Sequence, residues 1–388
     1  MSESIFFSVG EPSGDLHAAN LIRELRRIDP QQQFRGFGGS RVSEAGASID
    51  FDLTQLAVVG IVEVLPKLKE FFRVADVAEE IFRTERPRAV VLVDFPGFNW
   101  HIAKRAKKFG IPVIYYLPPQ LWAWGAWRLK KMRRTVDRVL CNLPFEPKWY
   151  ADRGMDVEYV GHPFFDEVAE RELDQTFIAQ QAARAGLRVA VLPGSRTREV
   201  DKIWPMQLEV IRRLARNHPQ VRFIVTPYKA HHEEACKRAM TSDDRGLNID
   251  FVVGRTSEVI QLADCALMKS GSVSLELMAR GTPAVVTYHA GRTLYAFGRC
   301  VSNLNSMTLP NIIAGRTVMP EFLAVGSTKK TIYQLTETMD RMLGDEAFRA
   351  SHRDQLLELA RQYAQPGAAK KAGEAIAQYL SPAKMKAA

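Results

Sequence analysis

The sequence predicts an α/β protein built from two parallel sheets, each flanked by helices. Short β-branched or apolar runs alternate with helix-length amphipathic segments, which is the order of βαβ units. This alternation runs to about residue 142 and starts again after residue 187. The chain has 388 residues, 46% of them apolar, which suffices for two ordinary domains with separate cores.

Each half supplies its elements in order. In the first half we expect strands at residues 5–9, 89–93, 112–117 and 138–142, and helices at 16–27 and 74–83. In the second half we expect strands at residues 188–192, 222–226, 249–253, 265–268 and 284–287, separated by helix-length segments. Strands joined by helices run parallel, so both halves predict a Rossmann-like, doubly wound sheet.

The segment between the halves is polar and has no strand character. We expect a hinge at residues 165–186, between a first domain at 1–164 and a second at 187–345. Residues 328–380 have helical character only, and we expect the C-terminal helices, 346–388, to pack back on the first domain. Such a helical end is also compatible with a homodimer formed by exchange between subunits.

The N-terminus and the hydropathy pattern predict a cytoplasmic protein. The apolar stretch at 5–9 has no basic flank and meets Glu11 too early for a signal peptide. No window approaches the roughly 20 uninterrupted apolar residues that span a bilayer, since the most apolar stretch, 89–98, contains Asp94.

Metal and disulfide frameworks are not indicated. The cysteines are far apart and form no C-x-x-C pair, so we expect reduced core thiols: Cys141, Cys236, Cys265 and Cys300. Adjacent side chains on a helix point in different directions, so His231 and His232 predict no metal site. We expect no cofactor.

The net charge of +9 predicts attraction to an anionic partner. The densest basic run follows a tryptophan cluster: Trp122, Trp124 and Trp127, then Arg128, Lys130, Lys131, Arg133 and Arg134. Such a run suits nucleic acid, with rings for stacking, or a membrane, with interfacial aromatics beside a polybasic patch. A solvated helix after a partly buried cluster is the structural alternative.

Ligands of open α/β sheets bind beyond the carboxyl ends of the strands, so the loops there are the informative ones. Neither a dinucleotide fingerprint nor a P-loop occurs, because the run Gly36-Phe37-Gly38-Gly39 lacks a third glycine at the required position. Dinucleotide binding and P-loop hydrolysis are therefore disfavoured.

The loop after the first strand is Gly10-Glu11-Pro12-Ser13-Gly14-Asp15. Its small residues allow a close approach of the backbone to a ligand, and the following helix start suits an anion or a sugar. The alternative is a capped turn with Ser13 or Asp15 as the N-cap.

Asp94 ends the strand at 89–93 and is followed by Phe95, Pro96 and Gly97, which delay the next helix. A carboxylate held at a strand tip beside Phe95 and Phe98 has a raised pKa and can accept a proton from an alcohol. Asp94 is our candidate general base, and a helix-capping Asp is the alternative.

Two loops of the second half suit a phosphate ligand. Gly194 and Ser195 offer donors, and Arg196 adds a cation suited to a diphosphate. The loop 269–276 supplies a serine-rich helix start, with Glu276 placed to accept ribose hydroxyls. A capping box of Ser272 or Ser274 with Glu276 is the competing interpretation.

Together these loops resemble the lipid A disaccharide synthase family of GT-B glycosyltransferases, over nearly the whole chain. The segments that carry the resemblance are 10–15 (GEPSGD), 57–65 (AVVGIVEVL), 122–124 (WAW), 143–146 (LPFE), 161–162 (GH), 192–196 (LPGSR) with 199–200, and 309–316 (LPNIIAGR). They stand in the family's order, which makes the combination specific.

The resemblance implies transfer of a sugar from UDP-2,3-diacylglucosamine to 2,3-diacylglucosamine 1-phosphate, giving a β-1',6-linked disaccharide 1-phosphate and UDP. It implies Asp94 as the catalytic residue. It implies substrate contacts at Gly10, Glu11, Ser13, Gly14 and Asp15. It implies UDP contacts at Gly194, Ser195, Arg196, Ser272, Val273, Ser274, Glu276 and Asn311.

This chain departs from the family pattern at three places. Gly97 stands where family members carry a second Asp, and 118–121 replace a Ser-Pro-Ser-Val lead into the tryptophans. Gly125 and Ala126 lengthen the Trp loop. These departures concern the acceptor side.

Acylated substrates sit in a bilayer, so we expect peripheral binding to the inner face of the inner membrane. The stretch 58–74 has an interfacial composition, with expected acyl or membrane contacts at Val59, Ile61, Leu65, Leu68, Phe71 and Phe72. A helix that faces the core is the alternative.

Two other functions compete. A UDP-N-acetylglucosamine 2-epimerase shares this fold but needs further acid/base residues around C2 and C3. An RNA-binding protein would use the Trp and basic run, and its binding would weaken steeply with salt. The transferase explains more of the motifs, so we expect no nucleic-acid partner.

Overall fold

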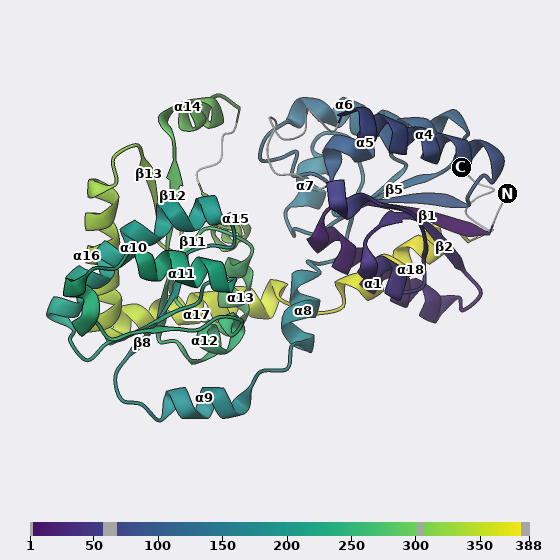
Figure 1. Cartoon of the computed structure of the whole chain (residues 1–388). Helices are drawn as coiled ribbons and strands as arrows, with labels where there is room; N and C mark the ends of the chain where they lie inside the picture. Colours follow the sequence, from purple (N-terminus) through teal and green to yellow (C-terminus); the bar gives the residue numbers. More distant parts are fainter. Residues whose placement is uncertain (1–2, 57–67, 302–305, 382–388) are drawn as a thin grey trace. The chain divides into compact units, whose positions relative to one another are not determined.

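The computed structural model describes residues 3–56, 68–301 and 306–381, which divide into two compact units (Figure 1). Unit 1 comprises Met1–Asp166 and Pro366–Ala388, and unit 2 comprises Glu167–Gln365. Each unit contains one parallel sheet with helices on both faces, as the sequence predicts. Among the described residues, no helix combines the length and the apolar character that a membrane crossing requires.

The sheet of unit 1 has the order β3-β2-β1-β4-β5-β6-β7, and every pair is parallel. Its strands are β1 (Ser4–Val9), β2 (Gln33–Gly38), β3 (Ser48–Asp52), β4 (Ala89–Val93), β5 (Val113–Tyr116), β6 (Arg138–Cys141) and β7 (Glu158–Tyr159). The chain winds outward from β1 in one direction and from β4 in the other. The loops after β1 and β4 therefore flank the point at which the strand order reverses.

Helices cover both faces of this sheet because side chains alternate along each strand. Phe6 of β1 packs with α4 (Leu68–Thr84), α5 (Pro96–Lys108) and α6 (Leu129–Thr135), whereas Ile5 and Phe7 pack with α1 (Pro12–Ile28) and α18 (Ala368–Tyr379). The remaining helical segments are α2 (Ser40–Glu44), η1 (Leu53–Leu56), η3 (Ala126–Arg128), α7 (Glu146–Ala151) and α8 (Phe164–Glu170).

The sheet of unit 2 has the order β10-β9-β8-β11-β12-β13, again parallel throughout. Its strands are β8 (Arg188–Leu192), β9 (Arg222–Val225), β10 (Ile249–Phe251), β11 (Cys265–Lys269), β12 (Ala284–Ala290) and β13 (Glu321–Val325). Its helices are α9 (Gln175–Ala182), α10 (Thr197–Asn217), α11 (Ala230–Arg238), η4 (Ser242–Gly246), α12 (Thr256–Leu262), α13 (Val273–Arg280), α14 (Arg292–Val301), α15 (Leu309–Ala314), α16 (Lys329–Gly344) and α17 (Glu346–Tyr363).

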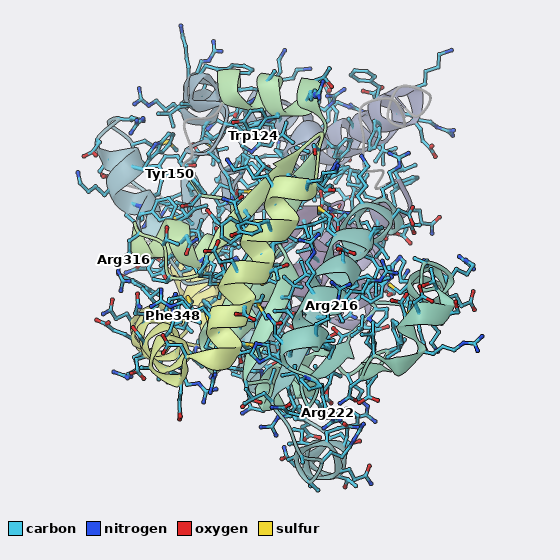
Figure 2. All side chains as sticks on the ribbon, turned by 90° about the vertical axis from the view of Figure 1, so that its left-hand side faces the viewer. Trp124, Tyr150, Arg216, Arg222, Arg316 and Phe348 are labelled. Atoms are coloured by element: carbon cyan, nitrogen blue, oxygen red, sulfur yellow. The ribbon has the colours of Figure 1, made fainter. Side chains whose placement is uncertain are left out.

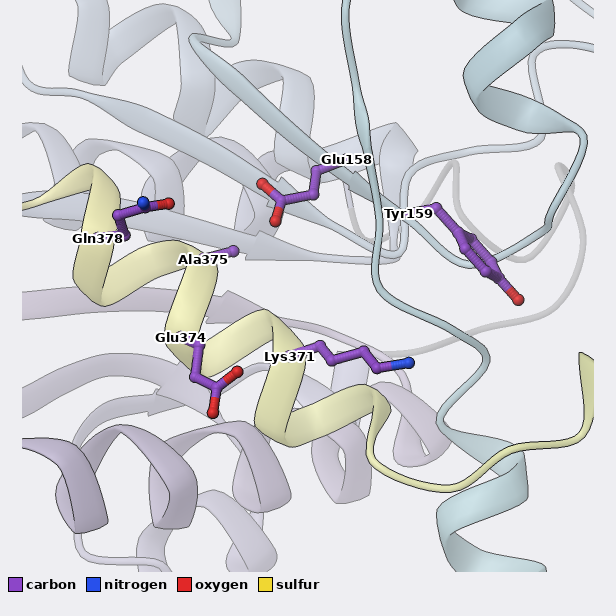
Figure 3. A pocket seen from close by; sticks show the side chains of 6 residues that line it. All are labelled: Glu158, Tyr159, Lys371, Glu374, Ala375 and Gln378. Carbon is purple, nitrogen blue, oxygen red and sulfur yellow. The ribbon is translucent and has the colours of Figure 1, made fainter.

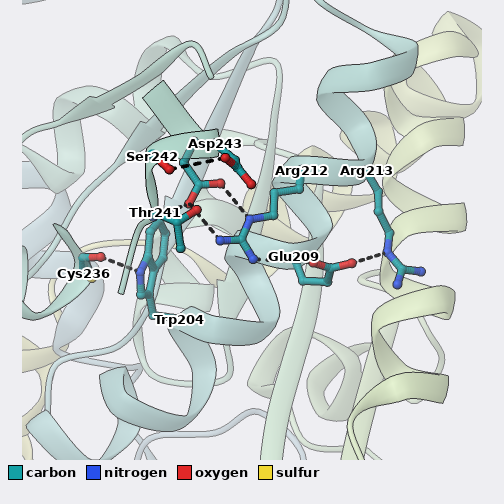
Figure 4. A network of polar contacts seen from close by, with 9 residues as sticks. Trp204, Glu209, Arg212, Arg213, Cys236, Thr241, Ser242 and Asp243 are labelled. Atoms are coloured by element: carbon teal, nitrogen blue, oxygen red, sulfur yellow. Dashed lines mark hydrogen bonds and ion pairs between the residues drawn. The ribbon is translucent and has the colours of Figure 1, made fainter. Parts of the chain in front are cut away.

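Polar contacts join the outer segments of unit 2 to one another and to its sheet. Arg212 of α10 donates two hydrogen bonds, of 2.7 and 2.8 Å, to Asp244 of η4, and Trp204 Nε1 donates to the carbonyl of Cys236 in α11 (Figure 4). Arg222 of β9, labelled in Figure 2, is 2% exposed and donates to Gln181 of α9 and to Asp250 of β10. A buried guanidinium is thus paired, as burial of a charge requires.

The C-terminus returns to unit 1. Helix α18 packs on α1, and its Ala372, Ala375 and Ile376 lie in the core between that helix and the sheet. The Asp166 carboxylate accepts hydrogen bonds from the first backbone N–H groups of this helix, at residues 367, 368 and 369. Helix α17, by contrast, packs against α13 within unit 2.

A shallow pocket of about 460 Å³ lies between α18 and β7 (Figure 3). It is lined by Glu158, Tyr159, Lys371, Glu374, Ala375 and Gln378. None of the residues that the sequence nominates for substrate or UDP contact lines it.

The nine strands expected from the sequence are all present, with ends shifted by at most a few residues. The all-helical character of residues 328–380 is also confirmed. Strands β2, β3, β7 and β13 were not predicted. Strand β2 carries Gly36 at φ 138°, where a Cβ would lie 2.0 Å from the Phe7 carbonyl oxygen, so the strand needs a glycine that a propensity pattern penalises.

Candidate active site

Two loops of unit 1 meet at the carboxyl edge of its sheet. Val9 at the end of β1 pairs with Val93 at the end of β4, so Gly10 and Asp94 follow paired residues. A Cβ on Gly14 would lie 3.9 Å from Asp94 Cβ. The structure therefore brings together the first loop and the candidate base, as the strand-end argument predicts.

Asp94 has a strained backbone and a perturbed carboxylate. Its φ is 47° and that of Phe95 is 44°, a conformation that side chains other than glycine rarely adopt. Burial, together with the negative charge of Glu11, raises the pKa of Asp94 to about 6. The N-cap of α5 is Phe95 and no side chain caps this helix, so the capping alternative for Asp94 is wrong.

The strained turn is held by two buried side chains. Asn99 Nδ2 donates to the carbonyls of Asp94 at 2.7 Å, Val93 at 3.2 Å and Ser8 at 3.3 Å, while Ser8 Oγ donates to Asn99 Oδ1. The Tyr115 hydroxyl donates to the Asp94 carbonyl at 2.8 Å. Asn99 and Tyr115 were not among the residues nominated from the sequence, because their role depends on contacts across three strands.

Aromatic packing fixes the other side of this turn. The Phe95 ring occupies the space beside Gly10, where a Cβ would lie 2.2 Å from Phe95 Cδ1. Phe71 of α4 packs against Phe95 and Phe98, with ring centroids 6.0 and 5.7 Å apart. Gly10 is thus required by packing, and Phe71 faces the core.

The remaining residues of the first loop differ in their roles. Glu11 is half-buried and its charge acts on Asp94, whereas Ser13 is exposed and does not cap α1. Asp15 is 4% exposed and accepts hydrogen bonds from the backbone N–H groups of Gly39 at 2.6 Å and Arg41 at 3.1 Å. Asp15 therefore orders the neighbouring loop after β2.

Unit 2 repeats this arrangement at its own sheet edge. Leu192 of β8 pairs with Met268 of β11, so the loops that start at Pro193 and Lys269 are adjacent. Lys269 Nζ lies 2.9 Å from Glu199 Oε1, and Arg196 Nη1 lies 3.1 Å from the same oxygen. Burial opposes ionisation of Glu199, but the hydrogen bond and charge of Lys269, with Arg196, outweigh it and lower the pKa of Glu199.

Gly194 belongs to this cluster. It has φ 121°, and a Cβ there would lie 3.0 Å from Glu199 Oε2. The Ser195 N–H points to the same carboxylate, at a long 3.4 Å. Lys269 and Glu199 were not nominated as site residues. The chain contains many Lys and Glu residues, and only the pairing of two strands distinguishes these two.

In the β11–α13 loop, Ser272 is exposed at the start of α13 and Val273 is half-buried. Ser274 is fully buried and its hydroxyl donates to the Gly271 carbonyl at 2.8 Å. Glu276 is 2% exposed and accepts from Arg280 Nε at 3.0 Å. No side chain caps α13, so the capping-box alternative is wrong.

The buried Asn311 side chain is hydrogen-bonded to the backbone of a nearby turn. It is 1% exposed, its Nδ2 donates to the Met319 carbonyl, and its Oδ1 accepts from the N–H groups of Val318 and Met319. Its amide stabilises the turn between α15 and β13. Both polar groups of the side chain are thus hydrogen-bonded within the protein.

The segment expected to contact acyl chains is described only in part. Val59, Ile61 and Leu65 lie outside the described residues, and α4 begins at Leu68. Phe71 is packed inward, and Phe72 is 50% exposed. The core-facing alternative thus applies to Phe71 and not to Phe72.

A second buried carboxylate holds the Trp loop. Glu146 accepts hydrogen bonds from Trp122 Nε1 at 3.0 Å and from the backbone N–H groups of Asn142 and Leu143. Burial raises the pKa of Glu146 to about 7.

Cys141, Cys236 and Cys265 are buried and unpaired, as expected. Within the described ranges, no group of three or more His, Cys, Asp or Glu side chains is arranged to hold a metal ion.

Comparisons with known proteins cover nearly the whole chain. A family model described as lipid-A-disaccharide synthetase matches residues 5–378. The lipid-A-disaccharide synthase of Anaeromyxobacter dehalogenans (strain 2CP-1) is 35% identical over 376 residues, which is 97% of each chain. That of Myxococcus xanthus is 34% identical over 387 residues, 98% of each chain.

Solved structures with this fold include enzymes of different activities. A UDP-N-acetylglucosamine 2-epimerase from Neisseria meningitidis, bound to UDP-GlcNAc, has a TM-score of 0.60 at 11% identity, covering 97% of this chain and 99% of that one. MurG of Acinetobacter baumannii has a TM-score of 0.60 at 13% identity, with the same coverage. Similarity at this level shows the GT-B fold alone.

Proposed function

The chain belongs to the lipid-A-disaccharide synthetase family, and on this premise we propose that it transfers 2,3-diacylglucosamine from UDP to 2,3-diacylglucosamine 1-phosphate. The products are the β-1',6-linked disaccharide 1-phosphate and UDP. The observation that carries the proposal is the Asp94 turn, in which a carboxylate with a pKa of about 6 is held at the switch point of the first sheet.

Asp94 is the general base of this reaction. It accepts the proton of the acceptor 6-hydroxyl while that oxygen forms a bond to the anomeric carbon and the bond to UDP breaks. The attacking and departing groups lie on opposite faces of the sugar, so the configuration inverts. A pKa near 6 leaves the carboxylate ionised at neutral pH and still basic enough to accept a proton.

The loops at the β8–β11 edge bind UDP. The exposed Arg196 side chain pairs with the diphosphate. The backbone N–H groups of Ser195, Ser272 and Val273 donate hydrogen bonds to the diphosphate oxygens. Gly194 allows the close approach. The negative charge that develops on the departing UDP is stabilised by these groups. The carboxylate of Glu276, close to the start of α13, accepts from the ribose hydroxyls.

Lys269 and Glu199 position Arg196 in this proposal. Glu199 forms ion pairs with both Lys269 and Arg196. These pairs hold the Arg196 side chain close to the carboxyl edge of the sheet. On the acceptor side, Glu11 and the exposed Ser13 contact sugar hydroxyls, and Gly10 and Gly14 leave room for them.

The protein acts in the cytoplasm, at the inner face of the inner membrane, where acylated substrates reside. A homodimer with exchanged C-terminal helices is part of the same expectation, and measurement of the mass in solution tests it. The epimerase alternative is not proposed, because its support is the fold alone at low sequence identity.

The test is incubation of the purified protein with both substrates, followed by mass analysis for a tetra-acyl disaccharide phosphate and for UDP. The wild type is expected to form both, and Asp94→Asn is expected to lose at least about 100-fold in turnover. Asp152→Asn, at an exposed surface ion pair with Lys148, is the matched control and should retain full activity. Near-normal turnover in Asp94→Asn would reject the assignment, and absence of product from the wild type would reject the function.

A further inference from the structure

One face of unit 1 combines exposed aromatic side chains with cations. We call it the Trp–Arg face, and it comprises Phe72, Lys104, Trp124, Trp127, Arg128 and Lys131. Trp127 is 77% exposed, Trp124 is 55% exposed and Phe72 is 50% exposed. Large apolar side chains at such exposure mark an interaction surface when they are gathered together.

Contacts make this face continuous from α4 to α6. The Arg128 guanidinium lies over both indoles, 5.4 Å from the Trp124 ring and 4.9 Å from the Trp127 ring. The charges of Arg128 and Lys104 act on Lys131, whose pKa is lowered first by burial and then by these two neighbours.

On the neighbouring helix, Lys131 and Lys104 also act on His101, whose ring packs edge-on against Phe72 at 5.4 Å. Figure 1 shows α4, α5 and α6 side by side on the same side of the sheet.

The cations of this face are not neutralised by the protein. The neighbours Arg105, Lys107 and Lys108 each form an ion pair with an acidic residue. In the part of the chain that the structure describes, no carboxylate lies within ion-pair distance of the cations at the Trp loop and α6. These cations are Arg128, Lys130, Lys131, Arg133 and Arg134, and the same holds for Lys104 on α5. Uncompensated positive charge of this kind is complementary to an anionic surface.

We propose that the Trp–Arg face binds the surface of an anionic phospholipid bilayer. Trp124 and Trp127 lie at the level of the headgroups, Arg128 and Lys131 contact lipid phosphates, and Phe72 reaches the acyl boundary. Indoles and guanidinium groups both have an apolar body and a polar edge, so a bilayer interface accommodates the stacked arrangement that the structure contains. This inference deepens the proposed function, since acylated substrates reside in such a bilayer, but binding is measured without substrate.

An RNA partner fits the observations less well. Stacking of bases requires free ring faces, and Arg128 already covers one face of both exposed indoles. Phe72, at the other end of the face, packs on His101 and is 50% exposed, so it adds an apolar side chain to the face. This arrangement matches an interface that is apolar on one side and anionic on the other.

The experiment is co-sedimentation of the full-length protein with vesicles of phosphatidylcholine, with and without phosphatidylglycerol. The wild type should bind the phosphatidylglycerol vesicles at least about tenfold more tightly, and the difference should shrink as salt is raised. Its tryptophan emission should shift to shorter wavelength on binding.

Three variants test the aromatic and the cationic parts of the face. Trp124→Ser with Trp127→Ser should weaken vesicle binding at least about tenfold and abolish the emission shift. Arg128→Glu with Lys131→Glu should remove the preference for phosphatidylglycerol. Trp127→Ser alone, at the most exposed aromatic position, leaves the core untouched and should still weaken binding.

Matched controls come from unit 2. Tyr333→Ser removes an aromatic side chain that is 61% exposed, and Lys329→Glu with Lys330→Glu changes the charge by the same amount at two exposed lysines. Both should bind vesicles as the wild type does. Equal losses in these controls would show a general charge or hydrophobicity effect and overturn the proposal.

Three other outcomes also overturn it: unchanged binding in all three face variants, equal binding to both vesicles by the wild type, or displacement of vesicles by a homopolymeric RNA that binds more tightly. Turnover of short-chain substrates in detergent separates this inference from the proposed function. Face variants that lose vesicle binding and keep that turnover support both. If the wild type turns over substrate but binds no vesicles, the proposed function is supported and the proposal that the Trp–Arg face binds a bilayer is rejected.

Discussion

At the scale of single residues, the proposed chemistry depends on a carboxylate in an unfavourable conformation. A positive φ outside glycine costs of the order of 1–3 kcal/mol, and Asp94 and Phe95 both adopt one. Asn99, Tyr115 and the packing of Phe95 against Gly10 impose it. The strain therefore has an identifiable support, and changes to that support should alter catalysis without contact to substrate.

Asp94 should set the acid limb of the pH profile. With a pKa of about 6, kcat/KM is expected to fall about tenfold per pH unit below pH 6 and to level off above it, because only the ionised carboxylate accepts a proton. Glu11→Gln removes a negative neighbour that raises this pKa, so it should move the limb to lower pH. The measurement is kcat/KM against pH for the wild type and Glu11→Gln. A limb that stays in place or moves upward would contradict the assignment.

Asn99 should act as a positioning residue. Asn99→Ala removes the Asn99 donor from the Val93 carbonyl and one of the two side-chain donors from the Asp94 carbonyl, so the turn loses about 1–3 kcal/mol of support. We expect kcat to fall about tenfold or more, with a small change in the Kd for UDP. Tyr115→Phe, which removes one donor, should have a smaller effect of the same kind. Parallel losses in kcat and UDP affinity would indicate general unfolding instead, and thermal melts control for it.

At the scale of elements, helix α18 depends on a residue far away in the sequence. Asp166 accepts from three N–H groups at the start of this helix, where a negative charge is favoured. Asp166→Asn keeps the size but loses the charge and one acceptor oxygen. It is expected to lower the free energy of unfolding by about 1–2 kcal/mol.

The measurement is chemical denaturation followed by circular dichroism. Asp29→Asn is the matched control, since Asp29 accepts a single hydrogen bond from Gln31 in an exposed turn. It should change stability by less than about 0.5 kcal/mol. An equal loss in both variants would mean that the Asp166 contact with α18 contributes no specific stability.

The same scale explains which elements a sequence pattern finds. Strands such as β4 and β11 are buried on both faces and appear as continuous apolar runs. Strand β2 contains two glycines, β3 is polar at alternate positions, and β7 has two residues, so none carries that signal. Their place in the sheet is decided by pairing with neighbouring strands: β2 pairs with β1, β3 with β2, and β7 with β6.

At the scale of the whole molecule, buried histidines link stability to pH. Burial lowers the pKa of His162 to about 3, and burial lowers that of His17 to about 4 in spite of the nearby Asp166. The unfolded chain binds these protons near pH 6.5, so acidification from pH 6.5 toward 3 favours the unfolded state. Burial raises the pKa of Asp94 and of Glu146, which acts in the opposite direction.

A variant comparison isolates the histidine contribution. His162→Gln removes one group that must stay neutral in the fold, so the variant should lose stability less steeply than the wild type between about pH 6.5 and 4. The difference in slope should be at most about 1.4 kcal/mol per pH unit. His231→Gln, at an exposed position, should leave the slope unchanged. Identical slopes for wild type and His162→Gln, measured by denaturant titration at several pH values, would contradict the account.

The sequence by itself determined the two parallel sheets and the loops of the candidate site, because βαβ order sends every strand end to one edge of its sheet. It therefore located Asp94, the loop at 10–15 and the loops at 194–196 and 269–276. Tertiary structure decided what each side chain does there. It buried Ser274 and Asn311, paired Lys269 with Glu199, turned Phe71 inward and Phe72 outward, and placed Asn99 under the Asp94 turn.

The physical reason is a difference in range. Backbone conformation follows largely from neighbouring residues, whereas burial, hydrogen-bond partners and pKa depend on groups that the chain brings together from far apart. The residues around Asp94 come from the first strand and its loop at 8–11, from helices at 71 and 99, and from a strand at 115, and no local pattern records that they meet.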